Sequence, residues 1–375
     1  MKFIHISDIH LGKIIYQKNL LPLQIDLLKQ VIDYLVTHEI DVLVIAGDIY
    51  DRAISSNESI ETLDWFLNSL INKHHKKVLM ISGNHDSNER LNFVSKLLEK
   101  QGLYIVAFPE KKIKPIVIDD VNFYLVPYFK PTYIAYLYQH ESFVSYQEAF
   151  EYYLSKQDID YTKTNVLVTH QFIAGNKEVI KSDSEVILSV GGSEIIDVES
   201  VSQFDYVALG HLHACQKIKY DYVRYAGSLM KYSFDEVNQK KGMLEVEIED
   251  KKVQCKMIPL KPQIDLIKVK GYFKDLLENE INNQDYVSVD LSDTSLIPHA
   301  NERLKNVYHH ILQLTYPYLN QHSSSNQTKA NQGFEQKGPL EILEEFYLKM
   351  KGEAMDLQTV NLVKDLIEEE TQSDT

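Results

Sequence analysis

The chain has 375 residues, of which 44% are hydrophobic and 25% charged, as in a globular protein with one large domain and smaller additions. No apolar run reaches the roughly 20 residues of a membrane span, and the amino terminus enters a predicted strand at once, so we expect a cytoplasmic protein with no membrane association. Two cysteines exclude a disulfide framework. A net charge of -15 excludes a ligand held by bulk positive charge alone.

Five short apolar runs along the chain each stop at residues of types that bind metals. Runs of this length, bounded in this way, are typical of buried parallel strands. Ligands of open α/β sheets collect at the carboxyl ends of such strands, so we expect the following side chains to meet. They are Asp8 and His10 after residues 3–7, Asp48 after 42–46, Asn84, His85 and Asp86 after 78–82, His170 after 165–169, and His211 and His213 after 206–209.

Helical spacing of apolar residues separates these strands and predicts the crossovers that a parallel sheet requires. Further short strands and a tyrosine-rich helical stretch with a polar interruption come later in the chain. The expected helices are 20–36, 60–70, 91–98 and 135–154, and the expected later strands lie within 105–127, 217–225 and 242–258. We therefore predict a four-layer α/β/β/α sandwich built on two sheets.

The remaining chain is predicted to form smaller parts. Residues 1–260 make the large domain, and strands and helices within 263–319 indicate a compact α+β module. Residues 320–338 are too polar to bury a core and are expected to be a linker. Residues 339–370 hold two amphipathic helical candidates, which are short and need a partner groove or coiled coil; an acidic tail that packs on its own domain is the alternative.

The strand-end residues predict a site for two metal ions. Asp8 and His10 are two residues apart on an extended chain, so they lie on one side and can share an ion, and the two oxygens of Asp48 can bridge two ions. Carboxylates, imidazoles and an amide suit Mn²⁺, Zn²⁺ or Fe. The predicted ligands are Asp8, His10, Asp48 and His213 for one ion and Asp48, Asn84, His170 and His211 for the other.

Such a pair of ions, about 3.5 to 4 Å apart, would activate water and polarise a phosphoryl oxygen. His85 follows the ligand Asn84 directly and so points elsewhere, toward a bound phosphate. There an imidazolium could stabilise the transition state or protonate the leaving oxygen. We expect Asp86 to fix the orientation of His85. The sequence therefore predicts phosphoester hydrolysis.

The same segments resemble the calcineurin-like metallophosphoesterase signature. It is carried by residues 8–10, 47–51, 83–86, His170 and 210–213. Residues 190–194, 227–234 and 241–242, the small module and residues 340–347 are similar to the SbcD family of DNA nucleases, and this likeness covers essentially the whole chain. Many members carry a basic residue after the last histidine, where this chain has Ala214.

The resemblance implies an ATP-dependent 3′ to 5′ exonuclease on double-stranded ends and a single-strand or hairpin endonuclease, in DNA repair, recombination and replication. It also implies Mn²⁺ as cofactor, an SbcC-type ATPase partner that binds the carboxyl-terminal helices, a homodimer, and a module at 263–319 that orients DNA. The expected substrate contacts are Gly191, Gly192, Arg52 and Lys231.

Two alternatives stay open beside the nuclease. One is another dimetal phosphoesterase such as a phosphatase; protein phosphatases share Asp51 and Arg52, but continue with glycine where this chain has Ala53 and end the third motif in glutamate where it has Asp86. The other is a non-catalytic scaffold for an ATPase. An apolar set at residues 20–28, wider than one stripe, predicts dimerisation through the amino-terminal helix, with core packing as the alternative.

Overall fold

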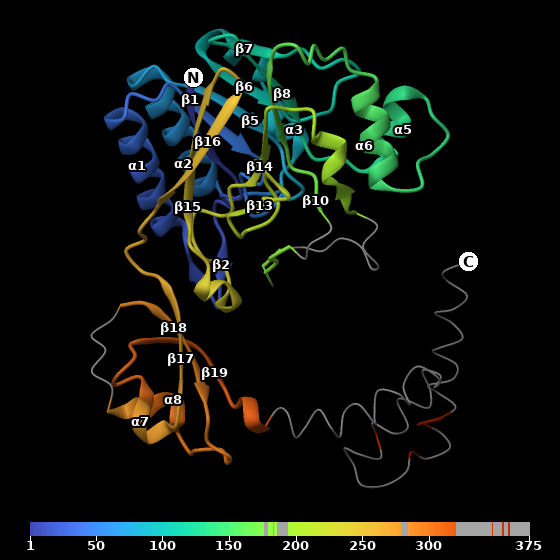
Figure 1. Ribbon diagram of the computed structural model, residues 1–375. Coiled ribbons are helices and arrows are strands. Elements are labelled where there is room, and N and C mark those ends of the chain that lie inside the picture. Colours follow the sequence, from blue (N-terminus) through green and yellow to red (C-terminus); the bar gives the residue numbers. More distant parts are fainter. Residues whose placement is uncertain are drawn as a thin grey trace. The chain divides into compact units, whose positions relative to one another are not determined.

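The computed structural model describes residues 1–175, 179–182, 184–185, 194–278 and 284–319, and the single positions 347, 355, 359 and 360. The chain divides into two compact units (Figure 1). One is Met1–Lys268 with Asn283–Ser288, and the other is Val269–Asn282 with Val289–Thr375. The predicted linker, the two tail helices, Gly191 and Gly192 lie outside the described residues, apart from the single positions in the tail.

The first sheet of the large unit has six strands. In spatial order they are β16 (Lys252–Pro259), β15 (Gly242–Glu249), β1 (Lys2–Ile6), β4 (Val42–Ala46), β5 (Lys77–Ile81) and β6 (Leu103–Val106). Strands β1, β4, β5 and β6 are parallel, whereas β15 and β16 add an antiparallel hairpin at one edge. Strands β1, β4 and β5 are the first three predicted strands, and β6 lies beside them.

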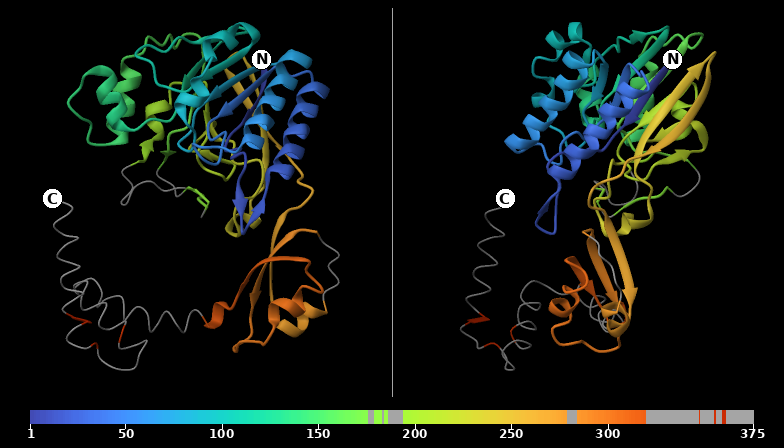
Figure 2. Two further views of the ribbon diagram at one scale, coloured as in Figure 1. Left: turned by 180° about the vertical axis from the view of Figure 1, so that it is seen from behind. Right: turned by 90° about the vertical axis from the view of Figure 1, so that its left-hand side faces the viewer.

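Helices cross between these parallel strands and cover the outer face of the sheet (Figures 1 and 2). They are α1 (Leu21–Thr37), α2 (Asn57–Asn68) with the π-helical turn η1 (Ser69–Lys73), and α3 (Asn88–Asn92) with α4 (Ser95–Leu98) and the 3₁₀ turn η2 (Glu99–Gln101). Ser56 caps α2 by accepting a hydrogen bond from the Ser59 amide. The expected helix at 91–98 is instead broken at Val94, which has φ 55°.

The second sheet also has six strands. In spatial order they are β13 (Gln216–Ile218), β14 (Tyr220–Tyr225), β12 (Tyr206–Leu209), β9 (Thr164–Thr169), β8 (Val121–Val126) and β7 (Ile116–Ile118). Helices α5 (Pro131–Tyr138) and α6 (Tyr146–Ser155) cover it through a cluster that includes Ile134, Phe150, Leu167 and Val207. Gln139, in the left-handed conformation, ends α5 at the predicted polar interruption.

A buried layer between the two sheets joins them. Phe3 on β1 meets Phe123 on β8 and Tyr206 on β12 edge to face, with ring centroids 5.5 and 5.7 Å apart. Alternate residues of each strand point into this layer, and the others point to the helices. The predicted four-layer α/β/β/α sandwich is confirmed.

Smaller elements complete the large unit. They are the strand pairs β2 (Ile14–Ile15) with β3 (Lys18–Asn19) and β10 (Ile173–Ala174) with β11 (Ile196–Asp197), and the 3₁₀ turns η3 (Val198–Val201) and η4 (Phe234–Asn238). The predicted α+β module contains β17 (Leu266–Gly271), α7 (Phe273–Leu277), β18 (Tyr286–Leu291), α8 (Ala300–Leu304) and β19 (His310–Thr315). Its sheet order is β17-β18-β19, so each strand pairs with the next along the chain.

The wide apolar set on α1 is core. Leu20, Leu21, Leu23, Leu27 and Leu28 are all buried within this single chain. Ile25, the remaining member of the set, is half-buried. This burial favours core packing, the alternative named above, and the dimer contact through this helix stays a prediction. Across the described residues, no helix combines the length and apolarity of a membrane span.

Candidate metal centre

The predicted ligands meet at one edge of the sandwich, at the carboxyl ends of strands from both sheets. Strands β1, β4 and β5 lead to Asp8, Asp48 and Asn84, whereas β9 and β12 of the second sheet lead to His170 and His211. Asp8, Asp48 and His211 have φ of 51°, 50° and 98°, in the left-handed region that residues other than glycine rarely adopt. Such strain persists where the surrounding structure imposes it, commonly at functional sites.

The first ligand set is formed by Asp8, His10, His213 and Asp48. The Nε2 atoms of His10 and His213 face one another at 3.1 Å, and His10 Nε2 lies 3.6 Å from Asp48 Oδ2. Donor atoms of Asp8, His10 and His213 all lie within 4.8 Å of one another. The first predicted set is thus assembled.

The second ligand set is formed by Asp48, Asn84, His170 and His211. Asn84 Oδ1 lies 3.2 Å from His170 Nε2 and 3.1 Å from His211 Nδ1, and His170 Nε2 is 3.3 Å from Asp48 Oδ2. Because Asp48 Oδ2 also faces His10, this one carboxylate joins both sets. The predicted bridging position of Asp48 agrees with this geometry.

These separations fit divalent ions. Two donors that each lie about 2.1 Å from one ion are themselves about 3 to 4 Å apart, as seen between His10 and His213 and around Asn84. Oxygen and imidazole donors together suit metals between the hard and soft extremes. The described side chains can therefore hold two divalent ions.

Glycines permit the close approach of the ligand-bearing segments. A Cβ at Gly210 would lie 1.9 Å from the Ala46 carbonyl oxygen and 2.6 Å from His170 Nδ1, and a Cβ at Gly83 would lie 2.1 Å from Asp48 Oδ1. Neither position has room for any side chain. The glycines of the motifs are thus required by packing against the ligands.

Hydrogen bonds on the far side of two of the rings, those of His170 and His213, fix which nitrogen faces the ions. His170 Nδ1 donates to the Ala46 carbonyl at 2.6 Å, which leaves Nε2 to face Asn84 and Asp48. His213 Nδ1 bonds the Ser184 hydroxyl at 2.7 Å and the Glu236 carboxylate at 3.1 Å, and its Nε2 turns to His10. Partners of this kind set tautomer and ring orientation in metal sites.

Glu236 belongs to a buried network that the sequence pattern does not reveal. Its carboxylate pairs with Lys241 Nζ at 2.6 Å and accepts hydrogen bonds from the Tyr232 amide at 3.1 Å and the Ser184 hydroxyl. Burial would raise the pKa of Glu236, but His213 and Lys241 hold it well below the usual range. In the sequence, only the position of Glu236 just after the 227–234 motif singles it out, and that position predicts no role for it.

The charges within the site support an ionised Asp48. Burial would raise the pKa of Asp48, but His170 and His10 lower it well below the usual value. Burial would likewise lower the pKa of His170, yet Asp48 and Asp8 raise it to about 9. For His211, burial and then the charge of His170 lower the pKa to about 3. His211 is therefore a neutral donor.

His85 lies beside the first ligand set, and its ring is held by a different partner from the predicted one. Its Nδ1 donates to the Asp51 carbonyl at 2.8 Å, and its ring meets that of His10 at 4.8 Å. The Asp86 carboxylate accepts instead from the amides of Gly83 and of the two residues after Asp48, at 2.8 to 3.1 Å. Asp86 therefore braces two ligand loops, and its predicted role in orienting His85 is wrong.

The predicted substrate contacts divide into two groups. Lys231 Nζ pairs with Asp265 at 2.7 Å and bonds the Leu266 carbonyl at 3.1 Å, so it is a structural residue rather than a substrate contact. The Arg52 side chain is 80% exposed and remains free to reach a ligand, and its Nε lies 3.7 Å from Asp51.

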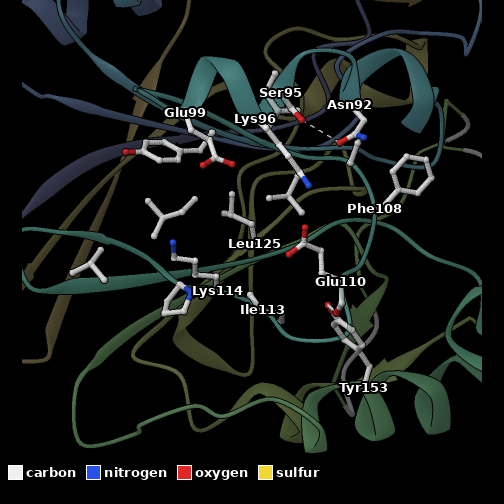
Figure 3. Close-up of a pocket in the computed structure, with 17 residues that line it drawn as sticks. Asn92, Ser95, Lys96, Glu99, Phe108, Glu110, Ile113, Lys114, Leu125 and Tyr153 are labelled. Carbon is white, nitrogen blue, oxygen red and sulfur yellow. Dashed lines mark hydrogen bonds between the residues drawn. The ribbon is translucent and has the colours of Figure 1, made fainter. Parts of the chain in front are cut away.

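A cavity of about 510 Å³ lies apart from the metal ligands, between α4, β6 and β7 (Figure 3). Lys96, Glu99, Glu110, Lys114 and Tyr153 line it, and none of the predicted site residues does. Its two cations and two carboxylates balance, so it offers no preference for a charged substrate.

Comparison with protein families divides the chain into two parts. Residues 1–215 match the calcineurin-like phosphoesterases, and residues 262–351 match a family described as the type 5 capsule protein repressor C-terminal domain, SbcD_C. The first match contains every predicted metal ligand. It establishes a phosphoesterase with a site for divalent metals.

Two curated relatives extend the likeness over most of the chain. The SbcD subunit of the nuclease SbcCD from Staphylococcus saprophyticus is 35% identical over 84% of both chains, and the protein of the same name from Staphylococcus epidermidis is 33% identical over 98% of both. The crystal structure of TT1561 of Thermus thermophilus matches 68% of this chain and 98% of its own at 11% identity, with a TM-score of 0.39, too low to bear on the fold. The chain thus belongs to the SbcD family of calcineurin-like phosphoesterases and is a nuclease that hydrolyses phosphodiester bonds.

Proposed function

We propose that this chain is the DNA-cleaving subunit of an SbcCD-type complex in the cytoplasm, active in DNA repair, recombination and replication. The observation that carries the proposal is the pair of ligand sets joined by Asp48, in a chain 33% identical over 98% of its length to a protein named as a nuclease subunit. We infer Mn²⁺ as the physiological metal from the likeness to the SbcD nucleases, and the donors, which are carboxylates, imidazoles and one amide oxygen, suit this ion.

The chemistry follows from what the side chains do around the phosphate. Divalent ions in such a site supply Lewis acidity and lower the pKa of water. Asp48 belongs to both ligand sets and so holds them together. Asp86 accepts hydrogen bonds from backbone amides in the loops that follow β4 and β5, and this keeps both loops in place. His85 has Nδ1 fixed by the Asp51 carbonyl, which leaves Nε2 to face a phosphate or to give a proton to the leaving oxygen.

The test compares three substrates with purified protein and Mn²⁺. These are a phosphate monoester, a base-free phosphate diester and end-labelled DNA, the last as single strand, hairpin and duplex. We expect the DNA and the diester to be cleaved and the monoester to be poor. Hydrolysis of the monoester alone would favour a phosphatase, and inactivity on all three with metal bound would favour a scaffold.

The full activity requires an ATPase partner of the SbcC type. The relatives are named as one subunit of SbcCD, which implies a second one. We propose that the helical candidates within 339–370 bind the coiled-coil base of that partner, that the 263–319 module orients DNA, and that ATP drives 3′ to 5′ resection of duplex ends.

Truncation after Gln332 tests the tail. The shortened protein should lose co-purification with the partner and ATP-dependent resection, yet keep Mn²⁺-dependent cleavage of single strands. Unchanged binding of the partner would place the contact elsewhere in the chain.

We also propose a homodimer, with a different face from that of α1. Exposed apolar side chains lie on the helices of the first sheet: Ile60 at 43%, Phe93 at 76% and Leu97 at 74% exposure. Burying these side chains between two copies would remove them from water. Light scattering should give a dimer for the wild type, a monomer for Leu97→Glu and a dimer for the control Val144→Glu, an exposed residue between α5 and α6; a dimeric Leu97→Glu would contradict this face.

A further inference from the structure

A second cavity of about 510 Å³ opens beside the metal centre and shares Asn84 with it. It lies at the same strand-end edge, between the loop after β5 and the loop after β8 with the following helix α5. The Tyr128 amide donates to the Ser82 carbonyl at 3.1 Å, which fastens these two loops to one another. The groove is thus built by the same framework that positions the metal ligands.

Three tyrosines give the groove its character. Tyr128 is half-buried and its hydroxyl bonds that of Tyr146 at 3.1 Å, and Tyr133 stacks on Phe108 at 6.1 Å. Tyr136, one turn beyond Tyr133 on α5, is 82% exposed. Its ring and hydroxyl make no hydrogen bond or ring contact with the rest of the described chain. An exposed ring at a groove wall is a surface for stacking.

The charges of the groove disfavour a phosphate as its occupant. Lys130 and Glu89 are both exposed and offset one another, and the buried Asp86 carboxylate is occupied by backbone amides. The neighbouring metal centre, when it holds its ions, would bind a phosphate more strongly than this groove. The groove therefore favours a flat, uncharged group as its occupant. A nucleobase is such a group, and aromatic rings stack on nucleobases of every kind.

We propose that this groove binds an unpaired nucleobase next to the phosphate being cleaved, and that Tyr136 is its stacking surface. The inference rests on the proposed nuclease function and adds a preference to it. A base within a duplex is paired and stacked and must be pulled out at a cost, whereas a base in a single strand or hairpin loop is free to enter. The groove therefore favours cleavage of unpaired DNA.

The experiment uses a single-stranded oligonucleotide with one cleavable phosphodiester among phosphorothioate linkages. The nucleotide on either side of that phosphate is intact or abasic, and kcat/KM is measured for the full chain with Mn²⁺. Loss of one stacked base should lower kcat/KM about 5- to 150-fold on one side of the cut in the wild type. The control is Tyr161→Ala. Tyr161 lies before the amino-terminal end of β9, whereas the metal ligands follow the carboxyl ends of the strands, so this variant should behave as wild type.

Tyr136→Ala should lower cleavage of the intact strand and leave the abasic strand unchanged, so that the ratio between them falls at least about 5-fold. Tyr136→Phe should keep the ratio, because it keeps the ring. Equal cleavage of intact and abasic strands by wild type, or an unchanged ratio in Tyr136→Ala, overturns the subsite while the nuclease function stands. Failure of wild type to cleave any strand while it cleaves a base-free diester overturns the proposed function and the subsite with it.

Discussion

Glu236→Gln tests how the protein holds His213 for the metal. The change keeps the size of the side chain but removes the charge opposite Lys241, whose Nζ lies 2.6 Å away in the buried interior. Breaking one partner of a buried ion pair costs about 3 to 5 kcal/mol of stability. It also weakens the acceptor for His213 Nδ1, and loss of such a partner lowers metal affinity about 10- to 100-fold.

The double variant Glu236→Gln/Lys241→Met separates the two effects. Removing the stranded ammonium should restore much of the stability, while the metal affinity stays low because His213 still lacks its carboxylate. The matched control Glu247→Gln breaks a surface pair with Lys2 at 3.4 Å, worth about 0 to 1 kcal/mol, and should leave metal binding unchanged.

The measurements are thermal unfolding of the metal-free protein and calorimetric titration of that protein with Mn²⁺. We expect a large fall in unfolding temperature for the single variant only, and weaker binding of one ion in both Glu236 variants. Wild-type Mn²⁺ affinity in the double variant would refute the orienting role of Glu236, whatever the stability.

Three further outcomes are expected. Asp48→Asn should lose at least one ion and nearly all hydrolysis, because an amide cannot supply two anionic oxygens; metal analysis with two ions and normal turnover would contradict this. His85→Gln should keep both ions and lower kcat about 10²- to 10⁴-fold, as for a lost general acid, and metal loss would show that it is a ligand. Gly210→Ala should lower the unfolding temperature strongly, because its Cβ would lie 1.9 Å from the Ala46 carbonyl oxygen, whereas Gly175→Ala, whose Cβ comes no nearer than 3.6 Å to a neighbour, should not.

The strands and metal ligands could be predicted because both depend on local pattern. Each apolar run must be buried on both faces, and the polar residue that ends it must lie at the sheet edge, so Asp48 and His170 are placed by their position after a strand. The order of the strands within two sheets then brings the ends together. No local pattern predicts that order, so it comes from the fold.

Side-chain partners could not be predicted in the same way. Lys231 and Asp265 are 34 residues apart in two different segments, and only the fold brings them to 2.7 Å. The sequence places Asp86 next to His85, but backbone amides nearer in space take both its oxygens. The apolar width of α1 is equally ambiguous, because one helix face can be buried by its own domain or by a second copy.

The metal centre takes its donors from both sheets, which gives bound ions a mechanical role in the sandwich. Asp48 and Asn84 follow strands of one sheet, and His170 and His211 follow strands of the other. An ion held between them cross-links the two halves and stabilises the folded chain by about 2.7 kcal/mol when its free concentration is 100 times the Kd. The unfolding temperature of the enzyme should therefore rise with the free metal concentration. A chelator should both stop catalysis and lower the unfolding temperature.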